Sequence, residues 1–388
     1  MKIAVVAGPQ VPVPPLKYGG TERVIGHLID GLRELGHEPI LIGPADSTVD
    51  CQIIPTVEKA LWFPRRKQDV AAYQKQLKAA LKKTEQVVDS IKNDVDIIHS
   101  HGVDMLPFKQ YPNVTTLHGP VTFELIPYYL RRLQLPYICI SENQTKVLPS
   151  LNVAGVVYNG LNPEEFPFVK KPEKYVVFIG RFDREKNPHL AIQLAISLGI
   201  KIKLAGKIDH LGDGYFEEEI EPHLDNPLVE YLGELGFDEK IELLSHALCN
   251  FHPTGFREPF GLTVLEAAYC GTPTLAISRG SMPELIIDGK TGVLVEDFEE
   301  GYMAFERAKK LKRREVADHA RKTFNYRNMA VGYVDVYEKV MAEFNKVSMP
   351  KKLWKWLVGS GVQKQPKKTY AASTKPVVSP SALKVSKS

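Results

Sequence analysis

The chain has 388 residues, of which 44% are hydrophobic and 25% charged, and its formal net charge is +4 at pH 7. This length favours two domains, and the ordinary composition indicates a globular protein. No apolar run reaches the length that spans a membrane, so a transmembrane protein is excluded. Residues 1–8 are too short an apolar run for a signal peptide and predict a first strand.

The cysteines and the charge distribution narrow the class of protein further. Cys51, Cys139, Cys249 and Cys270 are widely spaced, with no CxxC pair or metal-binding spacing. We therefore expect reduced thiols in a cytoplasmic protein. Residues 346–388 hold ten lysines and no acidic residue, which leaves the rest of the chain at a net charge of −6.

The first predicted unit joins a strand over residues 1–7 to a helix that begins near Thr21. The helix has an apolar face and ends at Gly36, and residues 37–43 form the next strand. Gly19 and Gly20 come just before this helix, where paired glycines either form a plain turn or let the backbone approach a phosphate, with Thr21 as N-cap. The pattern is neither GxGxxG nor a Walker loop.

Two histidines stand at the ends of predicted strands in the next part of the chain. After a lysine-rich helix over residues 66–93, strands are expected at 95–102, 114–120, 136–141 and 154–160. His101 and His118 fall at carboxyl ends, where open parallel sheets bind ligands, although a structural role is equally open. The DxD at residues 94–96 precedes its strand and is interpreted as a turn, not a metal site.

A Pro- and Lys-rich segment, residues 161–174, predicts a linker to a second alternating set of strands and helices. Strands are expected at 175–181, 202–206, 229–233, 247–253 and 274–277. The loop after the first of them carries Arg181, Arg184 and Lys186. Such a cluster suits a diphosphate, or is simply a solvated loop.

Glu258 and Glu266 stand eight positions apart where a loop runs into a helix that begins at Leu262. A helix start offers unpaired N–H groups to an anion. A carboxylate accepts hydrogen bonds from neighbouring hydroxyls. The stretch therefore either holds a phosphate between two diols, as in a sugar nucleotide, or places acidic residues in a first turn for reasons of dipole alone.

The chain closes with a predicted helix over residues 326–345 and the lysine-rich segment 346–388. The composition of that segment predicts disorder. Trp354 and Trp356 among lysines suit a membrane surface, although a mobile solubilising tail explains them as well. No folded basic face supports a nucleic-acid partner.

Taken together, these motifs resemble those of the retaining family 4 glycosyltransferases over residues 1–345. Glu258 to Glu266 matches the family's Glu-x7-Glu motif. Other segments resemble motifs of the family and occur in the same order along the chain: 19–22, 99–102, 117–119, 159–160, 180–186, 271–273, 283–286 and 288–292. The resemblance implies an α/β GT-B fold, with two Rossmann-like doubly wound domains facing across a cleft. It implies an N-terminal acceptor domain over 1–165, a donor domain over 166–325, a helix 326–345 crossing back to the first domain, and a tail over 346–388.

The resemblance also implies roles for individual positions. The catalytic set would be His118, Glu258, Arg181 and Lys186, with Glu258 on the sugar hydroxyls, His118 near the sugar, and the two cations on the diphosphate. The donor-binding set would be Gly19, Gly20, Gly233, Leu235, Phe260, Gly261, Leu262 and Glu266, with Glu266 on the ribose and the loop at 233–235 near the base. His101 would be an acceptor-side or supporting residue. No metal and no cofactor are expected.

The predicted function is metal-independent transfer of a hexose from a nucleotide sugar, expected to be UDP-linked, with retention of configuration. The alternatives are an epimerase or a phosphorolytic enzyme on the same fold, or a non-catalytic sugar-nucleotide-binding protein. The acceptor, whether lipid-linked, glycan or small molecule, is expected in the N-terminal domain. Two basic regions either face a membrane and a lipid-linked acceptor or are solvated: residues 65–67 with the lysine-rich helix after them, and Arg131 with Arg132. A cytoplasmic location is expected, with weak peripheral contact at the inner face of the membrane through the basic tail.

Overall fold

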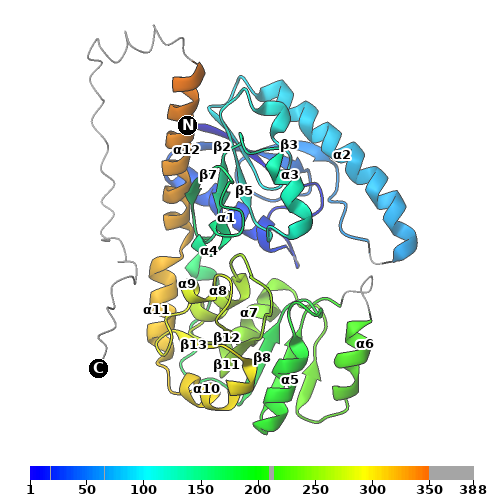
Figure 1. Ribbon diagram of the computed structural model, residues 1–388, viewed down its shortest axis with the longest axis vertical. Helices are drawn as coiled ribbons and strands as arrows, with labels where there is room; N and C mark the ends of the chain where they lie inside the picture. The colour runs from blue at the N-terminus through cyan, green and yellow to red at the C-terminus, as the bar shows by residue number, and fades with distance from the viewer. Residues whose placement is uncertain (18, 65, 209–213, 349–388) are drawn as a thin grey trace. The chain divides into compact units, whose positions relative to one another are not determined.

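The computed structural model describes residues 1–17, 19–64, 66–208 and 214–348, and these contain two all-parallel sheets (Figure 1). The N-terminal sheet has seven strands in the order β3-β2-β1-β4-β5-β6-β7. The C-terminal sheet has six, in the order β10-β9-β8-β11-β12-β13. Each sheet is built outward in both directions from a central strand, which is the doubly wound arrangement of Rossmann-like domains.

The strand bounds follow the short apolar runs of the sequence. In the N-terminal sheet they are β1 (Lys2–Val6), β2 (Glu38–Pro44), β3 (Gln52–Val57), β4 (Ile97–Ser100), β5 (Asn113–Leu117), β6 (Tyr137–Cys139) and β7 (Val153–Val156). In the C-terminal sheet they are β8 (Tyr175–Ile179), β9 (Lys201–Ala205), β10 (Val229–Tyr231), β11 (Cys249–His252), β12 (Thr274–Ile277) and β13 (Gly292–Val295).

The helices alternate with these strands. They are α1 (Gly20–Glu34), α2 (Val70–Ile91), α3 (Ile126–Leu130), α4 (Glu142–Thr145), α5 (Pro188–Ser197), α6 (Tyr215–Glu219), α7 (Phe237–His246), α8 (Leu262–Tyr269), α9 (Met282–Leu285), α10 (Gly301–Ala308), α11 (Arg313–Thr323) and α12 (Tyr326–Ser348). Helices fill the crossovers that parallel strands require.

Alternate residues of each central strand pack against helices on opposite faces. In β1, Ile3 and Val5 join the apolar cluster of α1 and α12, while Ala4 and Val6 join that of α2. In β8, Tyr175 and Val177 pack with α7 and α8, and their neighbours pack with α5 and α10. Burial on both faces explains why these strands are continuously apolar.

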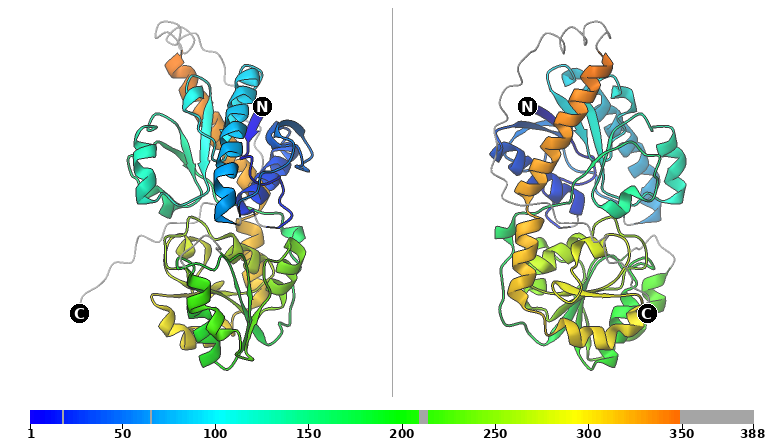
Figure 2. Two further views of the ribbon diagram at one scale, coloured as in Figure 1. Left: turned by 90° about the vertical axis from the view of Figure 1, so that its right-hand side faces the viewer. Right: turned by 60° about the vertical axis from the view of Figure 1, so that its left-hand side comes forward.

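Helix α12 passes from the C-terminal domain to the N-terminal one, as expected. In Figure 2 it runs upward from beside α11 and then along the N-terminal domain. Tyr337 Oη lies 2.6 Å from His99 Nδ1 in β4, and the Lys339 ammonium donates to the carbonyl of Ala154 in β7 at 2.8 Å. Gly31 of α1 has no side chain to separate it from Ala330 of α12. The helix therefore completes one face of the first domain.

Two strands and one helix start differ from the sequence-based expectation. β3 and β13 were not predicted. Both are edge strands, and β3 includes Pro55, which an edge position tolerates. Thr21 was expected as an N-cap, but α1 begins one residue earlier and Gly19 is the cap, with φ of 143°. Only glycine adopts that backbone readily, so the helix starts before Thr21.

The described part of the chain has no helix that is both long and apolar enough to cross a membrane. Residues 1–344 form one compact unit. The predictions for the basic tail beyond Ser348 lie outside the described residues, as does Arg65.

Candidate active site

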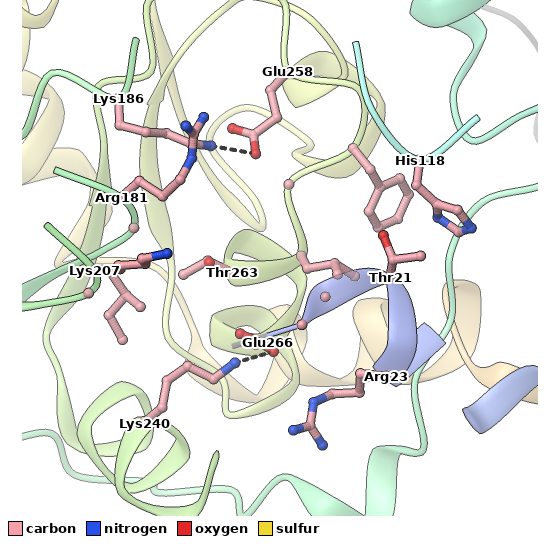
Figure 3. A pocket seen from close by; sticks show the side chains of 18 of the residues that line it. Thr21, Arg23, His118, Arg181, Lys186, Lys207, Lys240, Glu258, Thr263 and Glu266 are labelled. Atoms are coloured by element: carbon pink, nitrogen blue, oxygen red, sulfur yellow. Dashed lines mark hydrogen bonds and ion pairs between the residues drawn. The ribbon is translucent and has the colours of Figure 1, made fainter. Parts of the chain in front are cut away.

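A cavity of about 380 Å³ lies between the two domains, and residues that follow strands in both sheets line it (Figure 3). His118 follows β5, Arg181 follows β8, and Lys207 follows β9. The cavity therefore opens at the carboxyl ends of the strands, where parallel sheets bind ligands. Of the predicted site residues, it brings together Gly19, Gly20, His118, Arg181, Lys186, Leu235, Glu258, Phe260, Gly261, Leu262 and Glu266.

One end of the cavity is defined by Glu258. Lys186 Nζ lies 2.6 Å from Glu258 Oε1, and His252 Nε2 lies 2.8 Å from Oε2. Burial alone would raise the pKa of Glu258, but the charge of Lys186 and the hydrogen bonds from Lys186 and His252 outweigh burial and hold this pKa well below its usual range. A carboxylate that stays ionised is a strong acceptor for hydroxyl groups.

The other end is defined by Glu266, which Figure 3 shows well separated from Glu258. Glu266 is 3% exposed, and Lys240 Nζ on α7 lies 2.6 Å from its Oε1. Arg23 of α1 also lines this end, and its guanidinium carbon lies 3.7 Å from the centroid of the Phe237 ring. Two lysine–carboxylate pairs thus stand at opposite ends of one cavity.

Between the two carboxylates lie the starts of helices α8 and α1. Gly261 caps α8 in the left-handed region, with φ of 98°. A Cβ on Gly20 would lie 2.8 Å from Leu262 Cδ1, so the glycine is what lets the start of α1 approach the start of α8. The unpaired N–H groups of both helix starts therefore lie at the cavity, where they suit an anion.

Of the three cations predicted on the loop after β8, Arg181 and Lys186 line the cavity and Arg184 does not. Arg181 lines the cavity while its guanidinium lies 2.8 Å from Asp183 and 3.2 Å from Glu185. Arg184 is not among the lining residues, and its guanidinium lies 2.7 Å from Glu218 on α6. Lys207, which was not predicted from the sequence, lines the cavity in place of Arg184.

The two histidines lie in contact at the N-terminal side. His101 Nδ1 and His118 Nε2 are 2.8 Å apart. Burial lowers the pKa of His118 to about 4, and burial together with the neighbouring histidines lowers the pKa of His101 well below its usual value. Both rings are therefore neutral at pH 7. His101 does not line the first cavity but faces a second one of about 330 Å³, which shares Thr21 and His118 with the first.

Of the remaining predicted positions, Leu235 lines the cavity and Gly233 does not. Gly233 adopts φ of 73° and its carbonyl accepts a hydrogen bond from Gly206 N–H at 2.9 Å. It shapes the loop that carries Leu235. No group of three or more His, Cys, Asp or Glu side chains within the described ranges is arranged to hold a metal ion.

Several residues of the site were not predicted as part of it, namely Thr21 (expected only as an N-cap), Arg23, Lys207, Lys240, His252 and Thr263. His252 ends strand β11, so the strand-end rule that singled out His101 and His118 would have found it. Lys207 follows a glycine after β9 and could have been found in the same way. Arg23 and Lys240 are helix residues whose direction depends on contacts with distant segments, namely Phe237 for Arg23 and Glu266 for Lys240, which no local pattern reports.

The fold and the geometry of the site identify the structural class to which the protein belongs. AviGT4, a glycosyltransferase involved in avilamycin A biosynthesis, superposes with a TM-score of 0.69 at 22% identity, covering 88% of this chain and 98% of that one. HepE from Anabaena, solved with UDP and glucose, superposes with a TM-score of 0.63 at 16% identity, covering 87% and 99%. Two Rossmann-like domains facing a shared cavity, with a helix that crosses back, are the GT-B fold of glycosyltransferases.

Sequence comparison then gives the family. The model described as Glycosyltransferase Family 4 matches residues 18–165, and that described as Glycosyl transferases group 1 matches residues 163–323. The chain therefore belongs to the family 4 glycosyltransferases. Glycogen synthase of Mycobacterium tuberculosis is 23% identical over 331 residues, which cover 72% of this chain and 79% of that protein.

Proposed function

We propose that this glycosyltransferase moves a hexose from a UDP-linked donor to a hydroxyl acceptor, with retention of configuration and without a metal ion. The observation that carries the proposal is the pair of lysine-bound carboxylates, Glu258 and Glu266, at opposite ends of one cavity, with two helix starts between them. A sugar nucleotide has the same layout, because its hexose and ribose diols flank a diphosphate.

In this proposal the donor lies along the cavity wall of the C-terminal domain. Glu266 accepts hydrogen bonds from the ribose hydroxyls, and Glu258 accepts them from the hexose. Lys240 and Lys186 hold the two carboxylates in place at 2.6 Å each. Support for uridine comes from HepE, a fold neighbour that was solved with UDP and glucose.

The diphosphate is proposed to lie among Arg181, Lys186 and Lys207 and the N–H groups at the start of α8. Negative charge grows on the diphosphate as the bond to the sugar breaks, and fixed cations and N–H groups stabilise that charge. These side chains would provide the stabilisation that a divalent ion provides elsewhere. Transfer that persists in excess EDTA would support a metal-independent reaction.

The chemical step proposed is attack on the same face as the leaving group. The bond from the anomeric carbon to the diphosphate oxygen breaks, and a bond from that carbon to the acceptor oxygen forms. The acceptor's hydroxyl proton passes to the departing diphosphate oxygen. Glu258 is fixed by Lys186 and His252, which favours a binding role over that of a nucleophile.

The acceptor is proposed to enter the second cavity, on the side of the N-terminal domain. Its lining combines His101, Asp104, Tyr128, Tyr129 and Tyr137 with apolar side chains. His101 Nε2 is buried there without a hydrogen-bond partner among the described atoms, so an acceptor hydroxyl would satisfy it. This chemistry suits a hydroxylated acceptor with an apolar part, and a lipid-linked acceptor is one form of it.

We further propose a cytoplasmic enzyme with weak membrane contact through the lysines and tryptophans of residues 346–388. Co-sedimentation with anionic vesicles, with and without this segment, tests that contact. Full-length protein that remains in the supernatant would contradict it.

The decisive experiment offers the protein UDP-, ADP- and GDP-sugars with a panel of hydroxyl acceptors and measures release of nucleoside diphosphate. The proposal expects release only with an acceptor, and a product of unchanged anomeric configuration by NMR. An epimerase would convert the donor without release. A phosphorolytic enzyme would need inorganic phosphate, and a binding protein would show a thermal shift without turnover.

Variants separate the site from general effects on folding. Glu258→Gln and Lys186→Met should lose transfer. The matched control is an exposed ion pair, in which Nζ of Lys312, just before α11, lies 2.9 Å from Oε1 of Glu315 in α11. Lys312→Met should transfer sugar at the wild-type rate. Transfer at the wild-type rate by Glu258→Gln would overturn the site assignment.

A further inference from the structure

Glu284 of α9 joins the two domains through three hydrogen bonds. Its carboxylate accepts from the backbone N–H groups of Glu142 and Asn143, at 2.7 Å each, and from the hydroxyl of Tyr158 at 2.9 Å. The carboxylate belongs to the C-terminal domain, whereas all three donors belong to the N-terminal domain. Figure 1 shows α4, which begins at Glu142, next to α9.

On the N-terminal side, α4 is connected to the backbone that carries His118. Gln144 of α4 donates from its amide nitrogen to the carbonyls of Leu117 at 3.0 Å and Gly119 at 2.9 Å. Its amide oxygen accepts from Ile140 N–H at 2.9 Å. Because Leu117 and Gly119 flank His118, a displacement of α4 moves the histidine as well.

On the C-terminal side, the residues before α9 are bonded to the loop that carries Glu258. Ser281 donates from its N–H to the carbonyl of Glu258 at 3.0 Å and from its hydroxyl to the carbonyl of Phe260 at 2.5 Å. Gly280 has φ of 63°, and a Cβ there would lie 2.5 Å from Glu258 N. The start of α9 is therefore packed directly on the Glu258 loop.

We propose that Glu284 is a positioning residue. It fixes the position of His118 relative to the Glu258 loop when the two domains meet. The path runs from the Glu258 loop through Ser281 and Glu284 to α4, and from Gln144 to His118. Glu284 does not line the cavity, so it acts through these neighbours and not on the substrate. The inference rests on the proposed transfer reaction, which needs both sides of the cavity at once.

The chemistry of the three donors makes the carboxylate necessary. Both of its oxygens accept hydrogen bonds, one from Asn143 and the other from Glu142 and Tyr158. Burial and the neighbouring Glu284 raise the pKa of Tyr158 well above its usual value, so its hydroxyl keeps the proton that it donates. A glutamine has one acceptor oxygen and an NH2 group, which would face a backbone N–H and repel it.

The test compares Glu284→Gln with Glu142→Gln, a control at an exposed residue that contributes only its backbone N–H. We expect Glu284→Gln to lower kcat roughly tenfold or more, the loss typical of a charge-assisted hydrogen bond, while the Kd for UDP changes by less than about threefold. Glu142→Gln should match the wild type. Adding Gln144→Leu to Glu284→Gln should lower kcat by less than the product of the two single effects, because both act through α4.

A distance measurement decides the question without activity. Spin labels at Lys146→Cys beside α4 and Ile287→Cys beside α9, in a Cys51→Ser background, report the separation of the two elements with UDP bound. Glu284→Gln should lengthen or broaden the distance distribution, and Glu142→Gln should not.

Two results would overturn the inference: a distance distribution in Glu284→Gln that matches the wild type, or a loss of kcat accompanied by an equal loss of UDP affinity. A wild-type protein that transfers no sugar would refute the proposed function instead. In that case the distance measurement still tests the link between the domains.

Discussion

Removal of the Lys186 ammonium tests the electrostatics of the Glu258 end most directly. The two side chains are 13% and 14% exposed and their charged atoms are 2.6 Å apart. Lys186→Met keeps most of the side-chain volume but removes the ammonium. Of the two ion-pair partners of the buried Glu258 carboxylate, Lys186 and His252, only His252 then remains. Burial is the largest single influence on the pKa of Glu258 and raises it, so we expect burial to outweigh His252 once the Lys186 charge is removed.

The expected size of the effect follows from the burial of the pair. Breaking a buried ion pair by removing one partner costs about 3–5 kcal/mol, and the retained His252 places the expectation near the lower limit, at about 3 kcal/mol. For a domain of about 150 residues this corresponds to a fall in Tm of roughly 6–12 °C.

The stability of the wild type and that of Lys186→Met should change with pH in opposite directions. In the wild type the pKa of Glu258 is lowered, so its stabilisation is present above the unfolded pKa and is lost only as pH falls through the folded value. In Lys186→Met we expect burial to hold the pKa of Glu258 above its unfolded value, so stability should be lost as pH rises through the folded pKa. The difference between the two proteins should therefore be larger at pH 8 than at pH 5.

Thermal unfolding at both pH values measures this, and Lys186→Met/Glu258→Gln is the matched control. The double variant should recover stability at pH 8, because it removes the unpaired charge. An equal deficit at pH 5 and pH 8, or no recovery in the double variant, would refute the reasoning.

Three further predictions concern other parts of the molecule. Glu266→Gln should raise the Kd for UDP about tenfold, as expected for loss of a charged acceptor, and an unchanged Kd by titration calorimetry would contradict the ribose role. Burial lowers the pKa of His99, His101 and His118, so their contribution to stability should be complete above pH 6.5 and be lost as pH falls toward their pKa values in the folded state. The decline should be shallower in His101→Asn, and curves of Tm against pH that run parallel for this variant and the wild type would argue against it. Gly31→Ala would place a Cβ 2.6 Å from Ala330 Cβ and should destabilise α12 packing by roughly 1–3 kcal/mol, whereas a wild-type denaturation midpoint would show that the two helices can separate freely.

The sequence was informative wherever one local pattern determined the structure. The apolar run of β1 and the change to helical spacing after Gly261 predicted elements that the structure contains. Glu258, Lys186 and Glu266 were singled out in the same way, and the structure gathers them at one cavity.

What could not be predicted depends on contacts between distant segments. Lys240 pairs with Glu266 because α7 packs beside α8, and Arg184 turns to Glu218 because α6 lies within reach. β3 was missed because Pro55 interrupts a short run of β-branched residues, and proline is tolerated there because β3 is an edge strand, which the sequence alone does not indicate. The Glu284 carboxylate was read as part of a motif, but its partners in α4 are far from it in the sequence.

The late position of α12 has a consequence for synthesis of the chain. The seven strands of the first sheet are complete once Val156 has been made, but one of their faces is covered in part by a helix that begins at Tyr326. On the ribosome, apolar residues such as Val114 and Ile138 therefore remain without their final cover while the whole second domain is translated. Such exposed surface invites aggregation and chaperone binding. Translation that stops before Tyr326 would yield an N-terminal domain with part of its core exposed, so this domain is complete only once α12 has been made.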